Sequence, residues 1–112
     1  MHRDGCDPDN VRPEDVLCDF CGAAAWAAGK ACVEGHRGSL ICGDCLSNAY
    51  RSVVLRQDEL PSAECVLCLE VREEPAWRGR RAEAAACRRC IKQSAGVLHT
   101  SRHWDWVKPA NP

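Results

Sequence analysis

Two stretches of the chain carry apolar residues at helical spacing, and each stretch starts at a pair of cysteines. The first stretch has apolar side chains at Leu46, Ala49, Tyr50, Val53 and Val54. The second has them at Ile91, Ala95 and Leu98. This periodicity predicts two amphipathic helices. The first helix should end before Pro61, because proline and the residue before it disfavour helical backbone.

A glycine-containing turn between short apolar runs precedes each predicted helix. In the first half, Gly35 and Gly38 flank His36 and Arg37. In the second half, the turn lies near Gly79. Short apolar runs on both sides of such a turn are typical of a β-hairpin, so we expect one hairpin in each half of the chain.

Polar stretches divide the chain into two units. We expect five segments: a flexible N-terminal tail (1–15), a first unit (16–56), a linker (57–63), a second unit (64–99) and a C-terminal tail with two tryptophans (100–112). The N-terminal stretch around Cys6 is polar and has no apolar period, which favours a tail.

The composition is too poor in large apolar residues for an ordinary core. Of 112 residues, 26 are Val, Leu, Ile, Met, Phe, Trp or Tyr, whereas 10 are cysteine. A chain with so few large apolar residues needs an additional cross-link to be stable. We expect no membrane span and no secretory signal, because no apolar run is long enough. The expected location is therefore the cytoplasm, where clustered cysteines bind metal more often than they form disulfides.

Eight of the cysteines form four CxxC pairs. They are Cys18 and Cys21, Cys42 and Cys45, Cys65 and Cys68, and Cys87 and Cys90. A CxxC turn presents two sulfurs to one ion, and zinc prefers four thiolates in a tetrahedron. The sequence thus predicts two Zn²⁺ ions, with iron in a rubredoxin-like centre as the alternative ion.

Sequential pairing is the simplest way to assign the four CxxC pairs to two metal sites. It makes one site from Cys18, Cys21, Cys42 and Cys45 and another from Cys65, Cys68, Cys87 and Cys90. In the alternative, a RING-type cross-brace, the second and third pairs lie almost adjacent. Here 19 residues separate Cys45 from Cys65, which favours sequential pairing.

Each half therefore repeats the order of knuckle, hairpin and helix, where the knuckle is the turn that carries the first CxxC pair. The last two ligands lie in the first turn of the helix. This order is the treble-clef arrangement, and it predicts a small metal-stapled α+β fold of two tandem treble-clef-like units. A zinc ion with four thiolates has a formal charge of −2. A helix N-terminus presents free N–H groups and positive potential to such an anion.

The first half resembles the N-terminal four-cysteine zinc-binding domain of the ClpX family of bacterial unfoldases. The resemblance rests on the motif at 18–22, Cys-Asp-Phe-Cys-Gly, and on the motif at 41–45, Ile-Cys-Gly-Asp-Cys. It covers about residues 17–54 and extends more loosely to 65–98. The second knuckle departs from the pattern, with Leu69 in place of the glycine, and no ATPase module follows.

The resemblance implies how the units assemble and what they do. In the ClpX family the zinc domain dimerises and binds adaptors and substrates. The duplication in this chain implies a monomer with an internal pseudo-dimer, or else a homodimer. By the same resemblance we expect a protein partner, whose identity the sequence does not specify.

Several residues outside the ligand set are candidates for contacts. Cys32 and Trp77 each lie ten residues before a ligand cysteine, so we expect them at equivalent positions of the two hairpins, with Cys32 as a small buried residue. Trp26 and Trp77 are expected in the core. Trp104 and Trp106 are expected either to fold back onto the domain or to anchor a partner.

Charge is divided unevenly between the halves. Residues 1–64 have a net charge of −5 and residues 65–112 a net charge of +4. Arg88 and Arg89 belong to the basic half and are candidate partner-binding residues. A nucleic-acid-binding zinc-finger regulator that uses the basic second unit is therefore the alternative function.

The first expectation for function is a non-catalytic zinc-binding protein, acting as a protein–protein interaction or adaptor module. Four cysteine ligands leave zinc no open coordination position, and no catalytic triad can be assembled, so we expect no enzymatic activity.

Overall fold

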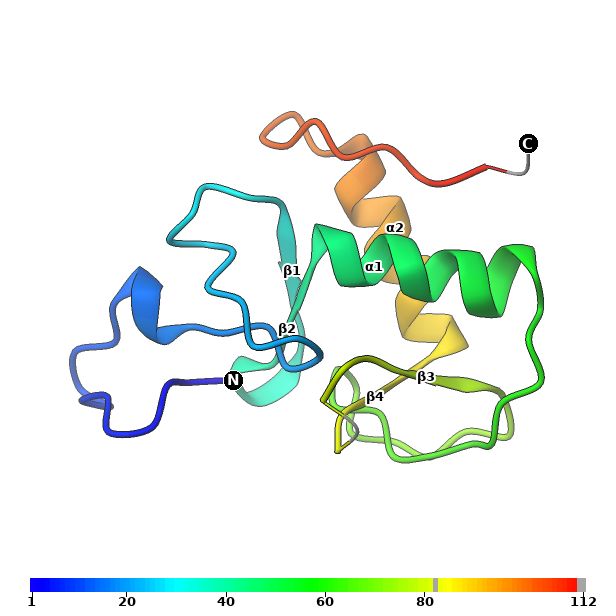
Figure 1. The fold of residues 1–112 in the computed structure, drawn as a ribbon, viewed down its shortest axis with the longest axis horizontal. Helices are drawn as coiled ribbons and strands as arrows, with labels where there is room; N and C mark the ends of the chain where they lie inside the picture. The colour runs from blue at the N-terminus through cyan, green and yellow to red at the C-terminus, as the bar shows by residue number, and fades with distance from the viewer. Residues whose placement is uncertain (82, 111–112) are drawn as a thin grey trace.

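Each half of the chain folds as a short hairpin followed by a helix (Figure 1). The computed structural model describes residues 1–81 and 83–110. The first half contains β1 (Cys32–Glu34), β2 (Leu40–Cys42) and α1 (Gly43–Tyr50), with a π-helical extension, η3 (Arg51–Leu55). The second half contains β3 (Ala76–Arg78), β4 (Ala85–Cys87) and α2 (Arg88–Thr100). Two 3₁₀ turns, η1 (Pro13–Asp15) and η2 (His36–Gly38), complete the regular structure.

Both helices bury the faces that periodicity predicts. Leu46 and Ala49 of α1 are buried, as is Val53 in its extension, and the helical segment ends at Leu55, before Pro61. Ile91, Ala95 and Leu98 of α2 are buried. The two predicted helices and the end of the first are therefore confirmed.

The two hairpins differ in length by one residue, and this difference changes which side chains correspond. In the antiparallel pair β1–β2, Cys32 lies opposite Cys42. In the pair β3–β4, Ala76 lies opposite Cys87 and Trp77 lies opposite Ala86. The expected equivalence of Cys32 and Trp77 is therefore wrong. The longer connection of the second hairpin shifts the register by one position. Because successive side chains of a strand point to opposite faces, this shift places the corresponding side chain on the other face.

The halves pack against each other through reciprocal contacts between turn and knuckle. The His36 amide, next to Gly35, donates a hydrogen bond of 3.0 Å to the carbonyl oxygen of Leu67 in the second knuckle. The Arg81 amide, next but one to Gly79, donates one of 3.0 Å to the carbonyl oxygen of Phe20 in the first knuckle. Phe20 and Leu67 are equivalent residues, so each half offers the other the same surface.

Glycine makes both approaches feasible. A Cβ atom on Gly35 would lie 2.8 Å from the backbone of Leu67, and one on Gly79 would lie 2.6 Å from the carbonyl oxygen of Phe20. Only a residue without a side chain fits at such distances. The glycine of each hairpin turn thus serves the contact between the halves.

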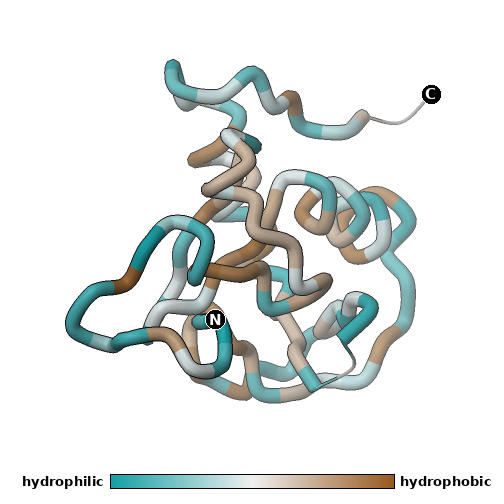
Figure 2. Tube along the Cα trace, turned by 60° about the vertical axis from the view of Figure 1, so that its left-hand side comes forward, coloured by the Kyte–Doolittle hydropathy of each residue, from teal (hydrophilic) through white to brown (hydrophobic). Residues whose placement is uncertain are grey.

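Both halves contribute to one hydrophobic core. Buried Phe20 and Leu46 of the first half belong to the same cluster as Leu67, Ile91 and Leu98 of the second. Figure 2 shows hydrophobic stretches of chain gathered in the middle of the molecule, with the hydrophilic N-terminal loop at its edge. Arg88 adds a polar contact between the halves, because its Nε donates a hydrogen bond of 3.1 Å to the carbonyl oxygen of Val53.

The N-terminal segment 1–15, expected as a flexible tail, is held at its start. The Met1 ammonium group donates hydrogen bonds to Asp19 Oδ1 at 2.6 Å, to the Leu17 carbonyl at 2.8 Å and to the Gly38 carbonyl at 3.0 Å. His2 pairs with Val16 in an antiparallel bridge. The segment therefore leaves the first unit as a loop and returns to it beside the first knuckle.

The C-terminal segment folds back onto α1. Of the two expectations for its tryptophans, this is the one in which they fold back onto the domain. Trp106 Nε1 donates hydrogen bonds to the Gly43 carbonyl at 3.0 Å and to Ser47 Oγ at 2.9 Å. Trp104 and Trp106 are half-buried against the core. Asn111 and Pro112, the last residues of the predicted tail, lie outside the described residues.

The remaining tryptophans differ from each other. Trp77 is half-buried, and its ring centroid lies 5.4 Å from that of Phe20. Trp26 is 47% exposed, so its expected place in the core is wrong. In the described ranges, neither helix has the length and the apolar composition required to cross a bilayer.

The contact between the halves can be tested by adding one methyl group. Gly79→Ala should destabilise the fold by about 1–3 kcal/mol, because its Cβ would overlap the Phe20 carbonyl. Gly96→Ala in α2 is the matched control, since no heavy atom of the described residues outside its own helix backbone lies within 4 Å of the added carbon. Alanine there should stabilise the helix by about 0.5–1 kcal/mol. Thermal unfolding of the metal-loaded variants gives the answer, and equal midpoints for the two would refute the reciprocal contact.

Candidate metal centres

The eight paired cysteines form two groups of four in the order of the chain. Cys18, Cys21, Cys42 and Cys45 make the first centre; Cys65, Cys68, Cys87 and Cys90 make the second. Within each centre all four sulfurs lie within 4.8 Å of one another, and three of the four residues are buried. The sulfurs therefore group as sequential pairing predicts, and both groups contain cysteine alone.

The first two ligands of each centre come from a tight turn. In the first knuckle the Gly22 amide donates to the Cys18 carbonyl at 2.8 Å, and in the second the Leu69 amide donates to the Cys65 carbonyl at 2.7 Å. Both turns require positive φ at this position, +80° for Gly22 and +65° for Leu69. The non-glycine residue in the second knuckle is accommodated in the left-handed conformation, and its side chain is 37% exposed.

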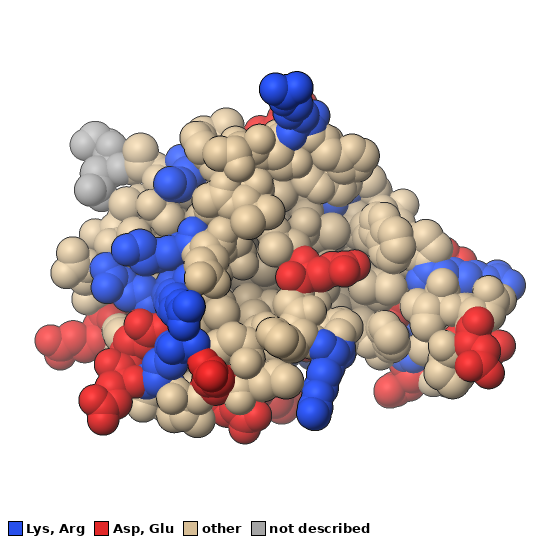
Figure 3. Space-filling model, turned by 180° about the vertical axis from the view of Figure 1, so that it is seen from behind, with Lys and Arg blue, Asp and Glu red and all other residues tan. Residues whose placement is uncertain are grey.

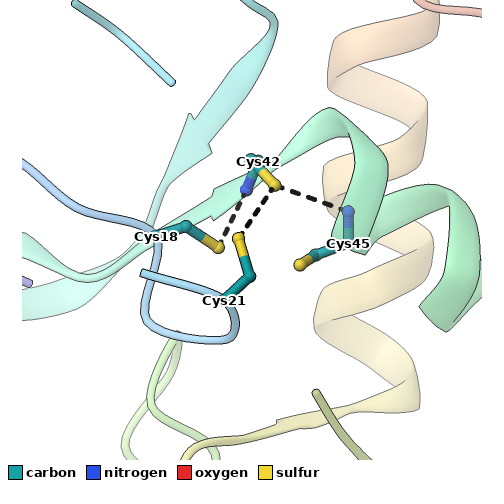
Figure 4. Close-up of side chains that lie close together, drawn as sticks. All are labelled: Cys18, Cys21, Cys42 and Cys45. Carbon is teal, nitrogen blue, oxygen red and sulfur yellow. Dashed lines mark hydrogen bonds between the residues drawn. The ribbon is translucent and has the colours of Figure 1, made fainter. Parts of the chain in front are cut away.

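The last two ligands of each centre lie at the start of a helix. Cys42 immediately precedes α1 and Cys87 immediately precedes α2, and Cys45 and Cys90 follow in the first turns. Figure 4 shows the side chains of Cys18 and Cys21 reaching from their loop toward Cys42 and Cys45. Both helices therefore direct their N-terminal ends toward a cluster of sulfurs, where positive potential favours thiolates.

Backbone amides surround the sulfurs of the first centre. The amides of Phe20 and Cys42 each donate to Cys18 Sγ at 3.4 Å, and the Cys45 amide donates to Cys42 Sγ at 3.5 Å. Figure 4 shows the bonds from the Cys42 and Cys45 amides. Hydrogen bonds to a thiolate stabilise its charged form. The knuckle and the helix start thus prepare the sulfurs for negative charge.

Without a cation, however, ionisation of Cys18 opposes ionisation of Cys42 and Cys45 in the first centre. Hydrogen bonds from the Cys42 and Cys45 thiols lower the pKa of Cys18 far below its usual range. The resulting Cys18 thiolate raises the pKa of Cys42 to about 12 and raises that of Cys45 further. A divalent cation lowers the pKa of every ligand thiol, because it stabilises four thiolates at once.

The helix-side thiols of the second centre behave in the same way. Burial raises the pKa of Cys87 to about 11, and burial and the charge of Cys65 raise the pKa of Cys90. The guanidinium group of Arg72 lies beside Cys68 and also pairs with Glu70. Sequence reasoning missed this cation, because nothing in the local pattern distinguishes Arg72 from the arginines around it.

The spacing of the sulfurs fits one tetrahedral ion in each centre. Cys21 Sγ and Cys42 Sγ are 3.8 Å apart, and Cys68 Sγ and Cys87 Sγ are 3.9 Å apart. In a tetrahedron with metal–sulfur bonds of about 2.3 Å, the sulfurs are about 3.8 Å apart. Both sites are therefore suited to a metal ion bound by four thiolates.

A cavity of about 870 Å³ adjoins the first centre. Its wall includes three of the ligands and the tryptophans Trp77, Trp104 and Trp106. Lys30 and Arg80 bring positive charge to the cavity, and Asp44 and Asp105 bring negative charge. This cavity could not be predicted from local patterns, because its residues come from four separate segments.

The candidate residues Arg88 and Arg89 lie at the start of α2. Arg88 is engaged with the Val53 carbonyl, so it contributes to the contact between the halves. The Arg89 side chain is exposed, while its backbone amide donates to Glu74 Oε1 at 3.0 Å. The structure therefore places one of the two in a packing role and leaves the other at the surface.

Comparison with known proteins adds no relative: no family model, curated protein or solved structure matches this chain.

The raised thiol pKa values predict a steep dependence of metal affinity on pH. Cys42 and Cys45 in the first centre, and Cys87 and Cys90 in the second, are protonated at neutral pH without metal. Each must release a proton on binding, so two protons per centre is the minimum, and affinity should fall by at least about 100-fold for each unit by which pH is lowered. Competition with a chromogenic chelator measures this slope. An affinity independent of pH would mean that these thiols are already ionised.

The second knuckle offers a stabilising substitution. Leu69→Gly should raise stability by about 0.5–1 kcal/mol, because glycine adopts positive φ without the strain that leucine bears. The control is Gly22→Leu in the first knuckle, which introduces that strain and should destabilise the chain. Thermal midpoints of the metal-loaded proteins should therefore move in opposite directions. A loss of stability in Leu69→Gly would show that the leucine side chain contributes more than its backbone costs.

Proposed function

We propose that this chain is a structural zinc protein that binds two Zn²⁺ ions, one at each four-cysteine centre. The grouping of the sulfurs carries the proposal: in each centre all four lie within 4.8 Å of one another, and one distance in each, 3.8 Å and 3.9 Å, matches the edge of a zinc–thiolate tetrahedron. Four thiolates satisfy zinc completely and leave it no open coordination position. The role that follows is non-catalytic.

Zinc is favoured over iron by the type of site. Zinc is the ion most often held by four cysteines in structural centres that fold a small domain. A rubredoxin-like iron centre has the same tetrahedral geometry, so geometry does not separate the two ions. An iron–thiolate centre absorbs visible light, whereas zinc does not, so colour distinguishes them.

Metal content tests the proposal directly. Native mass spectrometry of protein purified without added metal should find two zinc ions per chain. Cys18→Ser and Cys65→Ser should each retain one ion, since each removes a ligand from a different centre. Cys6→Ser is the matched control and should retain both. One ion per wild-type chain, or none, would contradict the proposal.

We propose further that the halves are two treble-clef-like units that form a pseudo-dimer within one chain. The order of knuckle, hairpin and helix in each half supports the first part. The reciprocal contacts of Gly35 with Leu67 and of Gly79 with Phe20 support the second. This arrangement agrees with the resemblance to the ClpX-type zinc-binding domain.

A protein–protein interaction or adaptor role is the function that we propose for this scaffold. Trp26 supports it, because a half-exposed tryptophan in a loop of small residues is typical of an interface anchor. The neighbouring residues Ala27, Ala28 and Gly29 are also exposed. The loop lies beside the cavity with three tryptophans, to which Ala28 and Gly29 contribute.

The distribution of charge favours a protein over a nucleic acid as the partner. On the face shown in Figure 3, Lys and Arg side chains lie among Asp and Glu side chains. Arg72 and Arg56 are paired with Glu70 and Asp58. Nucleic-acid binding needs a basic surface, so the alternative function has weaker support.

The interaction role is tested by separating binding from folding. Trp26→Ala should retain the thermal midpoint and both metal ions but lose a partner that co-purifies with the wild-type chain, because Trp26 is exposed. Trp106→Ala should lower the midpoint, because it removes the hydrogen bonds to Gly43 and Ser47. Equal partner binding by Trp26→Ala and wild type would contradict the proposed surface. Binding that falls steeply with salt, and that is lost on Arg89→Ala, would favour a nucleic acid instead.

A further inference from the structure

A ninth cysteine lies directly opposite a metal ligand. Cys32 of β1 pairs with Cys42 of β2. The flanking hydrogen bonds run from the Gly43 amide to the Ala31 carbonyl and from the Gly35 amide to the Ser39 carbonyl. Hydrogen-bonded pairs alternate along an antiparallel ladder, so the Cys32–Cys42 pair is a non-hydrogen-bonded one, with the two side chains on the same face.

This position has the geometry of a cross-strand disulfide. In a non-hydrogen-bonded pair the Cα atoms are about 4.5 Å apart, within the range of about 4.4–6.8 Å over which disulfides form. Strand pairing therefore sets the two Cα atoms at a separation over which a disulfide can form. Cys32 is half-buried, and buried Cys42 lines the cavity beside the first centre, so a small oxidant can approach the pair.

The Cys32 sulfur is also outside the group of four that would hold the ion. A disulfide between two ligands requires two sulfurs to leave the metal. A disulfide between Cys32 and Cys42 requires only one. Cys32 is thus the thiol best placed to capture a ligand that an oxidant has modified.

The second half provides an internal control. Ala76 occupies the position opposite Cys87, so that hairpin has no thiol beside its ligand. Both centres otherwise consist of two CxxC pairs whose four sulfurs lie within 4.8 Å of one another. Any oxidation that depends on the cross-strand pair should therefore affect the first centre alone.

We propose that Cys32 and Cys42 form a peroxide-sensitive disulfide site that releases the metal of the first centre. The Cys42 thiolate attacks hydrogen peroxide, so that an S–O bond forms, the O–O bond breaks, and hydroxide leaves and takes a proton from solvent. The Cys32 sulfur then attacks the oxidised Cys42 sulfur. The S–S bond forms, the S–O bond breaks, and the second hydroxide leaves as water with the Cys32 proton. The two sulfurs lose two electrons, and the peroxide accepts them.

The disulfide would also act on the segments that Cys42 positions. The Cys42 sulfur accepts the hydrogen bond from the Cys45 amide in the first turn of α1. The next residue, Gly43, accepts the hydrogen bond from Trp106 Nε1. Loss of Cys42 from the centre therefore loosens the start of α1 and the attachment of Trp106 to it.

The experiment treats the full chain, loaded with two zinc ions, with hydrogen peroxide. Released zinc is followed with a chromogenic chelator, and disulfides are mapped by mass spectrometry of peptides. We expect the loss of one of the two ions, a mapped Cys32–Cys42 bond, and recovery of the ion after thiol reduction in the presence of zinc. A first-centre disulfide that lacks Cys32, or equal loss from both centres, would overturn the proposal.

Three variants sharpen the result. Cys32→Ala should slow the loss of the first ion to the rate of the second, whereas Cys6→Ser should leave it unchanged. Ala76→Cys should make the second centre release its ion as well. Unchanged release by Cys32→Ala would refute the role of Cys32. The inference rests on the proposed zinc binding. Measuring the metal content before peroxide is added tests that binding separately. Disulfide mapping detects the Cys32–Cys42 bond with or without metal.

Discussion

The mutual repulsion of four sulfur charges is the constraint on which the rest of this structure depends. In the first centre the Cys18 thiolate raises the pKa of Cys42, and in the second centre burial together with the charge of Cys65 raises the pKa of Cys87 and of Cys90. A divalent cation turns this repulsion into a cross-link between a knuckle and a helix. The knuckle, the hairpin and the start of the helix in each half all lie around the four sulfurs that such a cation would join.

The contact between the halves follows from the same arrangement. Each knuckle holds an apolar residue between its cysteines, Phe20 in one and Leu67 in the other, and both are buried. Each of these residues meets the glycine of the opposite hairpin turn, and behind them the helices complete one common core. A chain with 26 large apolar residues thus has two four-cysteine groups suited to metal ions and one interior shared by its two halves.

Local patterns predicted the parts of the structure that local chemistry determines. The ligand groups, the buried faces of both helices and the two hairpins follow from spacing and periodicity. The rest depends on contacts between distant segments, which a single sequence does not reveal. Trp26 is exposed because its loop turns outward, Met1 is held by Asp19, and Arg72 lies beside Cys68. The expected equivalence of Cys32 and Trp77 failed because the second hairpin is one residue longer, so that Ala76 lies opposite its ligand cysteine.

The central claim is that metal ions replace a hydrophobic core as the main source of stability. The most direct measurement is circular dichroism of the full chain, under reducing conditions, as a chelator withdraws the metal. The account predicts that helical signal is lost as the ions leave and returns when zinc is restored, because structural zinc contributes on the order of 10–16 kcal/mol to folding. A metal-free chain that keeps its helical signal and its cooperative thermal transition would contradict it.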